Sequence, residues 1–115
     1  MKVLRSFKYA FDGIGYCFKN EINFRVHCFA AIAAVGLSIA FHITRGEWIA
    51  ILFAIALVFC LEVMNTVIEK LCDLVRPGPD QRVKVIKDMA AAAVLIGAII
   101  SLATGIIIFL PKFLA

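Results

Sequence analysis

The chain has 115 residues, of which 63% are hydrophobic, and it carries a formal net charge of +4 at pH 7. Its mean hydropathy of +1.00 excludes an ordinary soluble domain, because a protein of this size has too little interior to hide so many apolar side chains. We therefore predict one all-α integral membrane domain over residues 1–115, with the lipid bilayer as its surroundings and no separate soluble domain. No nucleic-acid partner is expected.

The N-terminal segment, residues 1–20, is predicted to form an amphipathic helix. Apolar side chains recur in it at three- and four-residue steps, and the basic side chains lie elsewhere. A basic helix with an aromatic stripe is typical of a segment that lies flat in the membrane interface. Residues 20–23 then break the pattern and offer a helix cap. The apolar stripe consists of Val3, Phe7, Ala10, Phe11, Ile14 and Phe18.

Three longer helices are predicted to follow. Residues 24–43 are long enough to cross the hydrocarbon core, and residues 44–47 are expected to form a turn. A second helix is predicted over residues 48–75, and the Pro-Gly-Pro sequence after it marks a break. A third helix is predicted over residues 80–110, and Pro111 is expected to end it.

The basic residues indicate the orientation of these helices. Lys and Arg are concentrated in residues 1–25 and 70–87, whereas the turn between the first two spans and the C-terminus carry one each. The positive-inside rule therefore places the N-terminus and the Pro-Gly-Pro loop in the cytoplasm. Soluble nucleotides are available on that side of the membrane.

Small residues occupy every fourth position in part of the third helix, a spacing that lets helix backbones approach closely. Packing within one chain and contact between subunits both remain open as explanations. The four cysteines show no paired spacing and are expected to be small apolar filler. The small residues of the third helix are Ala93, Gly97, Ser101 and Gly105.

A row of polar side chains interrupts the most hydrophobic part of the chain. Its members are spaced by three, four and four residues, so they fall within roughly 80° of one another on a helix. A carboxylate at membrane depth costs several kcal/mol, and such groups usually face a bundle interior, a cavity or an ion. The row therefore predicts a chemical site. It consists of Glu62, Asn65, Glu69 and Asp73.

The positions of the charged residues suggest their roles. Glu62 is the deepest acid, and a carboxylate at the lipid–water boundary can take the proton of a lipid hydroxyl as a general base. Glu69 lies nearer the cytoplasm and suits Mg²⁺, for which Glu21 is a natural second carboxylate, although Glu21 alone is equally consistent with a helix cap. Lys87 and Asp88 offer a phosphate contact and an acid, or simply an interfacial anchor.

Basic residues also flank the Pro-Gly-Pro loop, namely Arg76, Arg82 and Lys84. They are consistent with binding of nucleotide phosphates and equally with ordinary positive-inside charges. The sequence contains neither G-x-x-x-x-G-K-[ST] nor G-x-G-x-x-G. A nucleotide site in this chain would therefore be neither a P-loop nor a Rossmann site.

Two interpretations compete with an enzyme. Buried acids on membrane helices also line the paths of proton or cation carriers, but the outer halves of these helices offer few polar groups beyond Ser38 and His42. A purely structural membrane subunit would not need three acids and an amide in register. Both alternatives are therefore disfavoured.

The chain resembles the small prokaryotic integral-membrane lipid kinases, the diacylglycerol kinases and undecaprenol kinases. The resemblance covers nearly the whole chain and centres on a pattern of five polar positions on one membrane helix. It is carried by Tyr9-Ala10-Phe11-Asp12-Gly13, Asn20-Glu21-x-Asn23-Phe24-Arg25, Glu62-x-x-Asn65-Thr66-x-x-Glu69-x-x-x-Asp73 and Lys87-Asp88-Met89-Ala90.

The resemblance implies a homotrimer of three-helix protomers in the bacterial cell membrane, each with its amphipathic helix on the cytoplasmic face. It also implies transfer of the γ-phosphate of ATP to a lipid hydroxyl. On this resemblance Glu62 matches the catalytic base. Glu21 and Glu69 match the carboxylates that bind Mg²⁺ and bridge to ATP.

The remaining site residues follow from the same resemblance. Asn65 and Asp73 match polar residues that are needed in the active site. Lys87 and Asp88 match nucleotide contacts, and Tyr9 matches a position beside the adenine. The resemblance further implies that the site lies between neighbouring protomers.

The substrate branch is indicated by departures from the common pattern. Arg25 and His27 after Asn23-Phe24 resemble the undecaprenol branch more than the diacylglycerol branch, in which an acid tends to occupy the position of His27. Residues 76–80 are unlike either branch, so no ATP contacts are carried over to this loop. We therefore expect undecaprenol to be favoured over diacylglycerol as the lipid substrate.

Overall fold

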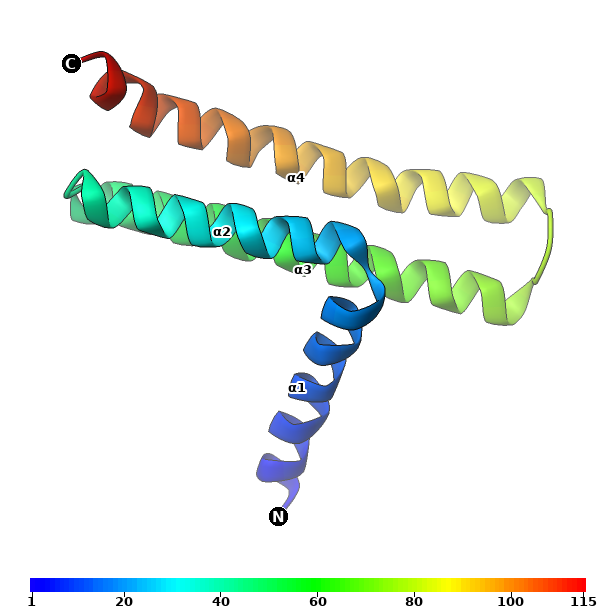
Figure 1. The fold of residues 1–115 in the computed structure, drawn as a ribbon. Coiled ribbons are helices and arrows are strands. Elements are labelled where there is room, and N and C mark those ends of the chain that lie inside the picture. Colours follow the sequence, from blue (N-terminus) through cyan, green and yellow to red (C-terminus); the bar gives the residue numbers. More distant parts are fainter.

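A computed structural model describes residues 1–115 as four helices without a strand (Figure 1). The three long helices run antiparallel to their neighbours in the chain, and the first helix leaves the bundle at a steep angle. The predicted all-α class and the predicted number of helices are confirmed. The helices are α1 (Lys2–Asn20), α2 (Ile22–Ala40), α3 (Arg45–Val75) and α4 (Gln81–Leu114).

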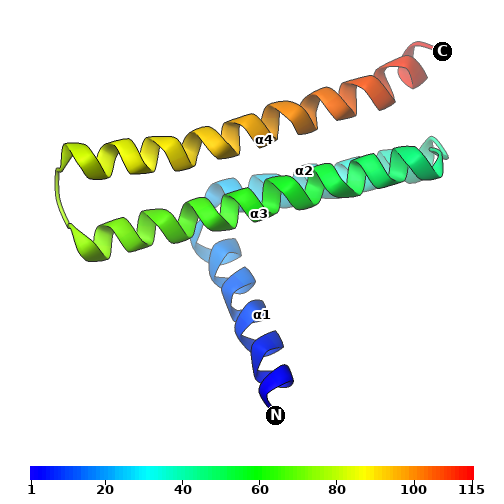
Figure 2. The same ribbon diagram turned by 180° about the vertical axis from the view of Figure 1, so that it is seen from behind.

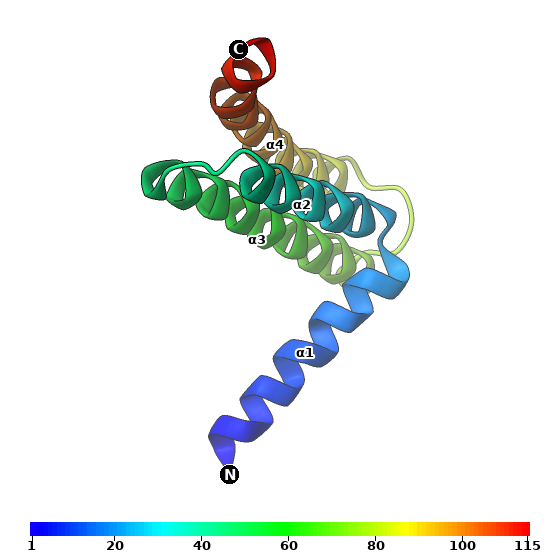
Figure 3. The same cartoon turned by 60° about the vertical axis from the view of Figure 1, so that its left-hand side comes forward.

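The central helix of the bundle is α3, which packs along α4 on one side and along α2 on another (Figures 2 and 3). Gly97 of α4 is buried against α3, and a Cβ atom at this position would lie 2.6 Å from Cδ1 of Leu61. Oγ of Ser101 donates a hydrogen bond of 3.2 Å to the carbonyl oxygen of Ala54. At Gly97 and Ser101 the small residues therefore serve packing within the chain.

The lengths of the helices differ in a way that matters for the site. The 19 residues of α2 span about 28 Å, close to the thickness of a hydrocarbon core. The 31 residues of α3 and the 34 of α4 span about 46 and 51 Å. Both helices extend beyond α2 at the α3–α4 connection (Figure 1). All three are long and apolar enough to cross a membrane.

We call the two ends of this bundle the loop end, at residues 76–80, and the turn end, at residues 41–44. The turn predicted at residues 44–47 is wrong, because these residues begin α3. Oγ1 of Thr44 accepts a hydrogen bond of 3.1 Å from the backbone N–H of Glu47, and Oε1 of Glu47 accepts one of 3.0 Å from the N–H of Thr44. This reciprocal capping box satisfies two N–H groups that a helix start otherwise leaves unpaired.

Two other predicted boundaries also change. The break predicted at residues 20–23 is confined to Glu21, whose extended backbone separates α1 from α2 and whose side chain caps neither helix. The expectation that Pro111 ends the last helix is wrong, because α4 continues to Leu114. A proline this near the C-terminus removes one backbone hydrogen bond from a helix that ends within a turn.

The bundle leaves much of its apolar surface uncovered. Only 12 of the 115 residues are buried, and large apolar side chains are exposed along all four helices. An isolated soluble protein rarely exposes so much apolar surface, so these faces are suited to lipid or to other subunits. The small core lies at the turn end and consists of Ile43, Ile51, Ile108 and Phe109.

Candidate active site

Glu62 lies on the face of α3 that packs against α2, and it is only 3% exposed. Nε2 of His27 on α2 lies 3.5 Å from Oε2 of Glu62, within ion-pair distance, yet this oxygen accepts no hydrogen bond. The backbone carbonyl of Glu62 accepts a hydrogen bond of 3.1 Å from Oγ1 of Thr66. A buried carboxylate oxygen without a donor is costly, and such groups are concentrated where a protein performs chemistry.

Two contacts hold α1 and α2 beside this carboxylate. The buried ring of Phe24 on α2 meets Phe59 on α3 edge to face, with 5.1 Å between the ring centroids. Nη1 of Arg25 donates hydrogen bonds to the carbonyl oxygens of Phe18 at 2.8 Å and Lys19 at 3.1 Å. These two carbonyls belong to the last turn of α1, which otherwise lacks donors. Arg25 therefore fixes the end of α1, and with it the position of the following residue, Glu21.

The carboxylates of Glu21 and Glu69 lie within electrostatic reach of Glu62. Oε1 of Glu69 accepts a hydrogen bond of 3.2 Å from Nδ2 of Asn65, and Oδ1 of Asn65 is buried without a partner. No three His, Cys, Asp or Glu side chains gather closely enough to form a complete metal cage. A pair of carboxylates is, however, the ligand set that suits Mg²⁺ when phosphate oxygens and water complete its coordination.

The loop end brings Asp73 and Lys87 together from different helices. Nζ of Lys87 on α4 donates to Oδ1 of Asp73 on α3 at 2.6 Å, so these two predicted site residues are in direct contact. Asp88 points elsewhere and accepts a hydrogen bond of 2.6 Å from Nζ of Lys84. Lys84, Lys87 and Asp88 also line a hollow of about 510 Å³ beside the start of α4.

Asp80 organises the loop itself. Its Oδ1 accepts from the backbone N–H of Arg82 at 2.9 Å, and its Oδ2 accepts from Nη2 of Arg82 at 3.3 Å and from Nε of Arg76 at 3.0 Å. The side chains of Arg82 and Arg76 thereby hold the pKa of Asp80 below its ordinary value. Both arginines, whose role the sequence left open, are therefore engaged in holding the loop.

Tyr9 is the one predicted site residue that the chain keeps remote. It is 65% exposed and belongs to α1, the helix that points away from the bundle (Figure 3). Glu21 lies twelve positions further along the chain, about 18 Å along a helix. Within one protomer, Tyr9 and the acids of α3 do not form a common site.

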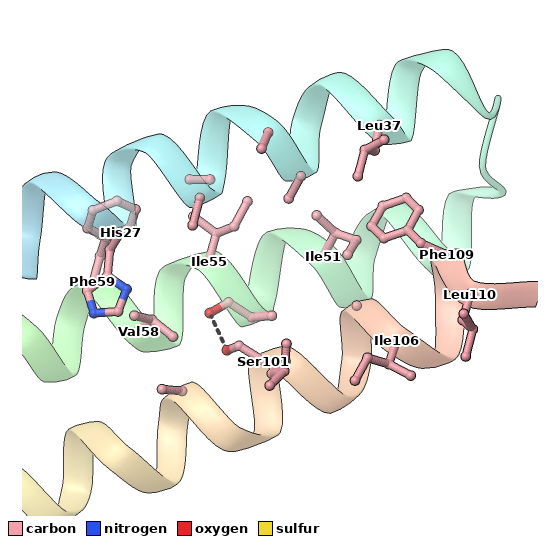
Figure 4. Close-up of a pocket in the computed structure, with 18 of the residues that line it drawn as sticks. His27, Leu37, Ile51, Ile55, Val58, Phe59, Ser101, Ile106, Phe109 and Leu110 are labelled. Carbon is pink, nitrogen blue, oxygen red and sulfur yellow. Dashed lines mark hydrogen bonds between the residues drawn. The ribbon is translucent and has the colours of Figure 1, made fainter. Parts of the chain in front are cut away.

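An apolar groove of about 580 Å³ runs between α2, α3 and α4. His27 lies with Val58 and Phe59 at one end of it, and Phe109 and Leu110 lie at the other (Figure 4). The groove is lined almost entirely by hydrocarbon, as a site for an apolar ligand is. The one hydroxyl group in its lining, on Ser101, already donates a hydrogen bond to a backbone carbonyl.

Two residues beside the site were not predicted as members of it. Cys17 of α1 is 5% exposed, and burial first, then the nearby charge of Glu21, raises the pKa of its thiol. A protonated, buried thiol is poorly nucleophilic, so Cys17 is apolar filler as expected. The other is His27, which sequence reasoning used only to choose a lipid branch. Its contact with Glu62 depends on how α2 lies against α3, for which sequence spacing carries no signal.

Comparison with known proteins identifies the family whose sequences this chain matches. Residues 8–109 match the family described as prokaryotic diacylglycerol kinase. The chain is similar to a diacylglycerol kinase of Synechocystis sp., with 34% identity over 98% of this chain and 65% of that protein. It is also similar to the undecaprenol kinase of Bacillus subtilis, with 37% identity over 96% of this chain and 90% of that protein. A diacylglycerol kinase of Haemophilus influenzae is 31% identical over 93% of this chain and 92% of its own length.

Proposed function

The chain belongs to the prokaryotic diacylglycerol kinase family and is a membrane lipid kinase, and from this premise we propose that it transfers the γ-phosphate of ATP to a lipid hydroxyl with Mg²⁺ as cofactor. The observation that carries the proposal is the buried carboxylate of Glu62, which lies beside one end of an apolar groove. The family resemblance drawn from the polar row is confirmed, and the ion-carrier interpretation gains no support from it.

In the proposed reaction, Glu62 accepts the proton of the lipid hydroxyl as the hydroxyl oxygen bonds to the γ-phosphorus. The bond between the γ-phosphorus and the bridging oxygen breaks, and ADP leaves with that oxygen. A carboxylate with one unpartnered oxygen is suited to hold the transferred proton, because the new O–H needs no existing hydrogen bond to be broken. The lipid product is a phosphate monoester.

The nucleotide is proposed to bind at the loop end of α3 and α4. Glu21 and Glu69 would hold Mg²⁺, which neutralises charge on the phosphate oxygens when bound. Asn65 orients the carboxylate of Glu69 through their hydrogen bond of 3.2 Å. Lys87, held by Asp73, and Asp88 beside it would contact the nucleotide. This arrangement requires the loop end to face the cytoplasm, as the distribution of Lys and Arg predicts.

A homotrimer is proposed as the assembly. The exposed apolar faces of α2, α3 and α4 support contact with further copies as well as with lipid. The position of Tyr9, far from the acids of its own chain, also supports a site shared between protomers. In such a site, α1 of one chain would lie over the loop end of its neighbour.

Undecaprenol is proposed as the preferred lipid, with diacylglycerol as the alternative. The identities of 37% to an undecaprenol kinase and 34% to a diacylglycerol kinase do not separate the two. Of the two residues on which the preference rests, Arg25 is engaged with the end of α1. Only His27 lines the groove, so the preference rests on His27.

The test is ATP-dependent phosphorylation by the purified full-length protein in mixed micelles, with undecaprenol and diacylglycerol assayed in parallel. We expect transfer to a lipid that stops when EDTA removes Mg²⁺, with the higher kcat/KM for undecaprenol. A preference for diacylglycerol would overturn the substrate assignment and keep the kinase. Transfer to neither lipid by folded protein with Mg²⁺ present would overturn the proposed reaction.

A further inference from the structure

His27 belongs both to the lining of the apolar groove and to the surroundings of Glu62, the deepest acid of the polar row on α3. It is a polar side chain on the wall of an otherwise apolar groove, and it faces a carboxylate on the neighbouring helix. The second polar side chain on that wall is Ser101, and its hydroxyl already donates a hydrogen bond to the backbone carbonyl of Ala54. The imidazole lies at one end of the groove (Figure 4). It is the one polar side chain of the lining that is also within ion-pair distance of the buried acid.

The contact between His27 and Glu62 is close but incomplete. Nε2 of His27 lies 3.5 Å from Oε2 of Glu62, and Oε2 has no hydrogen-bond partner. A closer approach of about 0.5 Å would bring the two atoms within ordinary hydrogen-bond distance. Catalytic hydrogen bonds are often long without substrate and tighten when it binds.

No other side chain around Glu62 donates a hydrogen bond to Oε2 of its carboxylate. Thr66 bonds to the backbone carbonyl of Glu62 rather than to its side chain, and Asn65 donates to Glu69. Glu21 and Glu69 are themselves acids, and their side chains offer Oε2 no N–H donor. His27 is the only basic side chain within ion-pair distance of Glu62.

We propose that His27 is a positioning residue for phosphate transfer, which holds the Glu62 carboxylate in one orientation at the end of the apolar groove. A lipid alcohol whose hydrocarbon lies in the groove would then present its hydroxyl to an oriented base. This inference rests on the proposed function, since it assigns His27 a part in that reaction. Misplacement of a catalytic group by about 1 Å can cost about 100-fold in rate.

Three variants separate this role from a packing role. His27→Leu removes the N–H donor and leaves an apolar side chain on an apolar wall. His27→Gln keeps an amide N–H that reaches as far as Nε2 but cannot act as a base. Val26→Leu is the matched control, because this neighbouring side chain on α2 is 57% exposed and does not line the groove. Each variant is assayed as full-length protein in micelles, with kcat and KM measured separately for lipid and for MgATP.

We expect His27→Leu to lower kcat for the lipid about 100-fold and to leave the KM for MgATP within about threefold of wild type. His27→Gln is expected to recover kcat to within about tenfold of wild type, and Val26→Leu to match wild type. Equal kcat in wild type and His27→Leu would overturn the inference. Failure of His27→Gln to exceed His27→Leu, with both folded, would also overturn it, because the imidazole itself would then be the proton acceptor. If wild-type protein transfers phosphate to neither lipid, the proposed function fails instead.

Discussion

Replacing Glu62 by Gln removes the negative charge from the site and preserves the shape of the side chain. The structure indicates that this change is mild for folding, because Oε2 of Glu62 accepts no hydrogen bond that the substitution would break. The new amide oxygen can also take the place of Oε2 opposite Nε2 of His27, 3.5 Å away. We expect the free energy of unfolding to change by less than about 1.5 kcal/mol, the net value of one hydrogen bond.

The effect on catalysis is expected to be much larger. General base catalysis contributes about 10²- to 10⁴-fold in rate, and each factor of ten corresponds to about 1.36 kcal/mol in the activation free energy. Loss of the base from Glu62 should therefore raise the barrier by about 2.7 to 5.4 kcal/mol. The KM for MgATP is expected to stay within about threefold of wild type, because the proposed nucleotide contacts lie further toward the loop end.

The assay is phosphate transfer from ATP to lipid in mixed micelles, combined with thermal unfolding of the same preparations. Glu47→Gln is the matched control, since it makes the same substitution on the same helix at the turn end. Glu47 caps α3 and pairs with Lys112 at 3.0 Å, and glutamine also serves in a capping box. Glu62→Gln with more than a tenth of the wild-type kcat and an unchanged melting temperature would refute the general-base role.

The remaining predictions concern the cation, the packing and the loop. Glu69→Ala is expected to raise the Mg²⁺ concentration for half-maximal activity at least about tenfold, and an unchanged Mg²⁺ titration would remove Glu69 from the metal site. Gly97→Val is expected to destabilise the bundle by about 1 to 3 kcal/mol, because its Cβ would lie 2.6 Å from Cδ1 of Leu61; thermal unfolding in detergent checks this. The pKa of Asp80 is lowered, first by hydrogen bonding to the side chain of Arg82. The charge of Asp80 therefore stabilises the fold above the ordinary pKa of about 3.9. This stabilisation is lost as the pH falls below that value. Asp80→Asn should therefore flatten the dependence of melting temperature on pH below about pH 4, and an equally steep dependence there would contradict this.

The features that sequence predicted well are those set by local periodicity. Spacing of three and four residues placed Asn65 and Glu69 on one face of a helix, and the structure joins them by a hydrogen bond. The same reasoning placed the apolar stretches correctly, because an apolar run of sufficient length has few alternatives to a spanning helix. The T-x-x-E pattern of a capping box at Thr44 and Glu47 is also present in the sequence, but residues 44–47 were predicted as a turn.

The features that sequence could not predict depend on contacts between elements. The distance between His27 and Glu62 follows from the register of α2 against α3, which no spacing within either helix determines. The pairing of Asp73 with Lys87 likewise follows from how the loop returns α4 along α3. In the proposed trimer, the position of Tyr9 relative to a nucleotide would depend on a second chain, so neither the sequence nor one protomer determines it.

In the proposed function, the unequal lengths of the helices let one face of α3 serve two very different substrates. His27 lies near the start of α2 and at the level of Glu62, so α2 continues beside α3 for only five more residues, about 7.5 Å, toward the loop end. The continuation of α3 from Glu62 to Val75 spans about 20 Å, and Glu69 lies about 10 Å beyond Glu62. A lipid hydroxyl stays near the depth at which its hydrocarbon chain ends, whereas ATP arrives from water. In the proposed function, the base must therefore lie at the level of α2 and the cation ligand beyond it. Moving Glu62 by one helical turn along α3 would separate the base from both His27 and the groove.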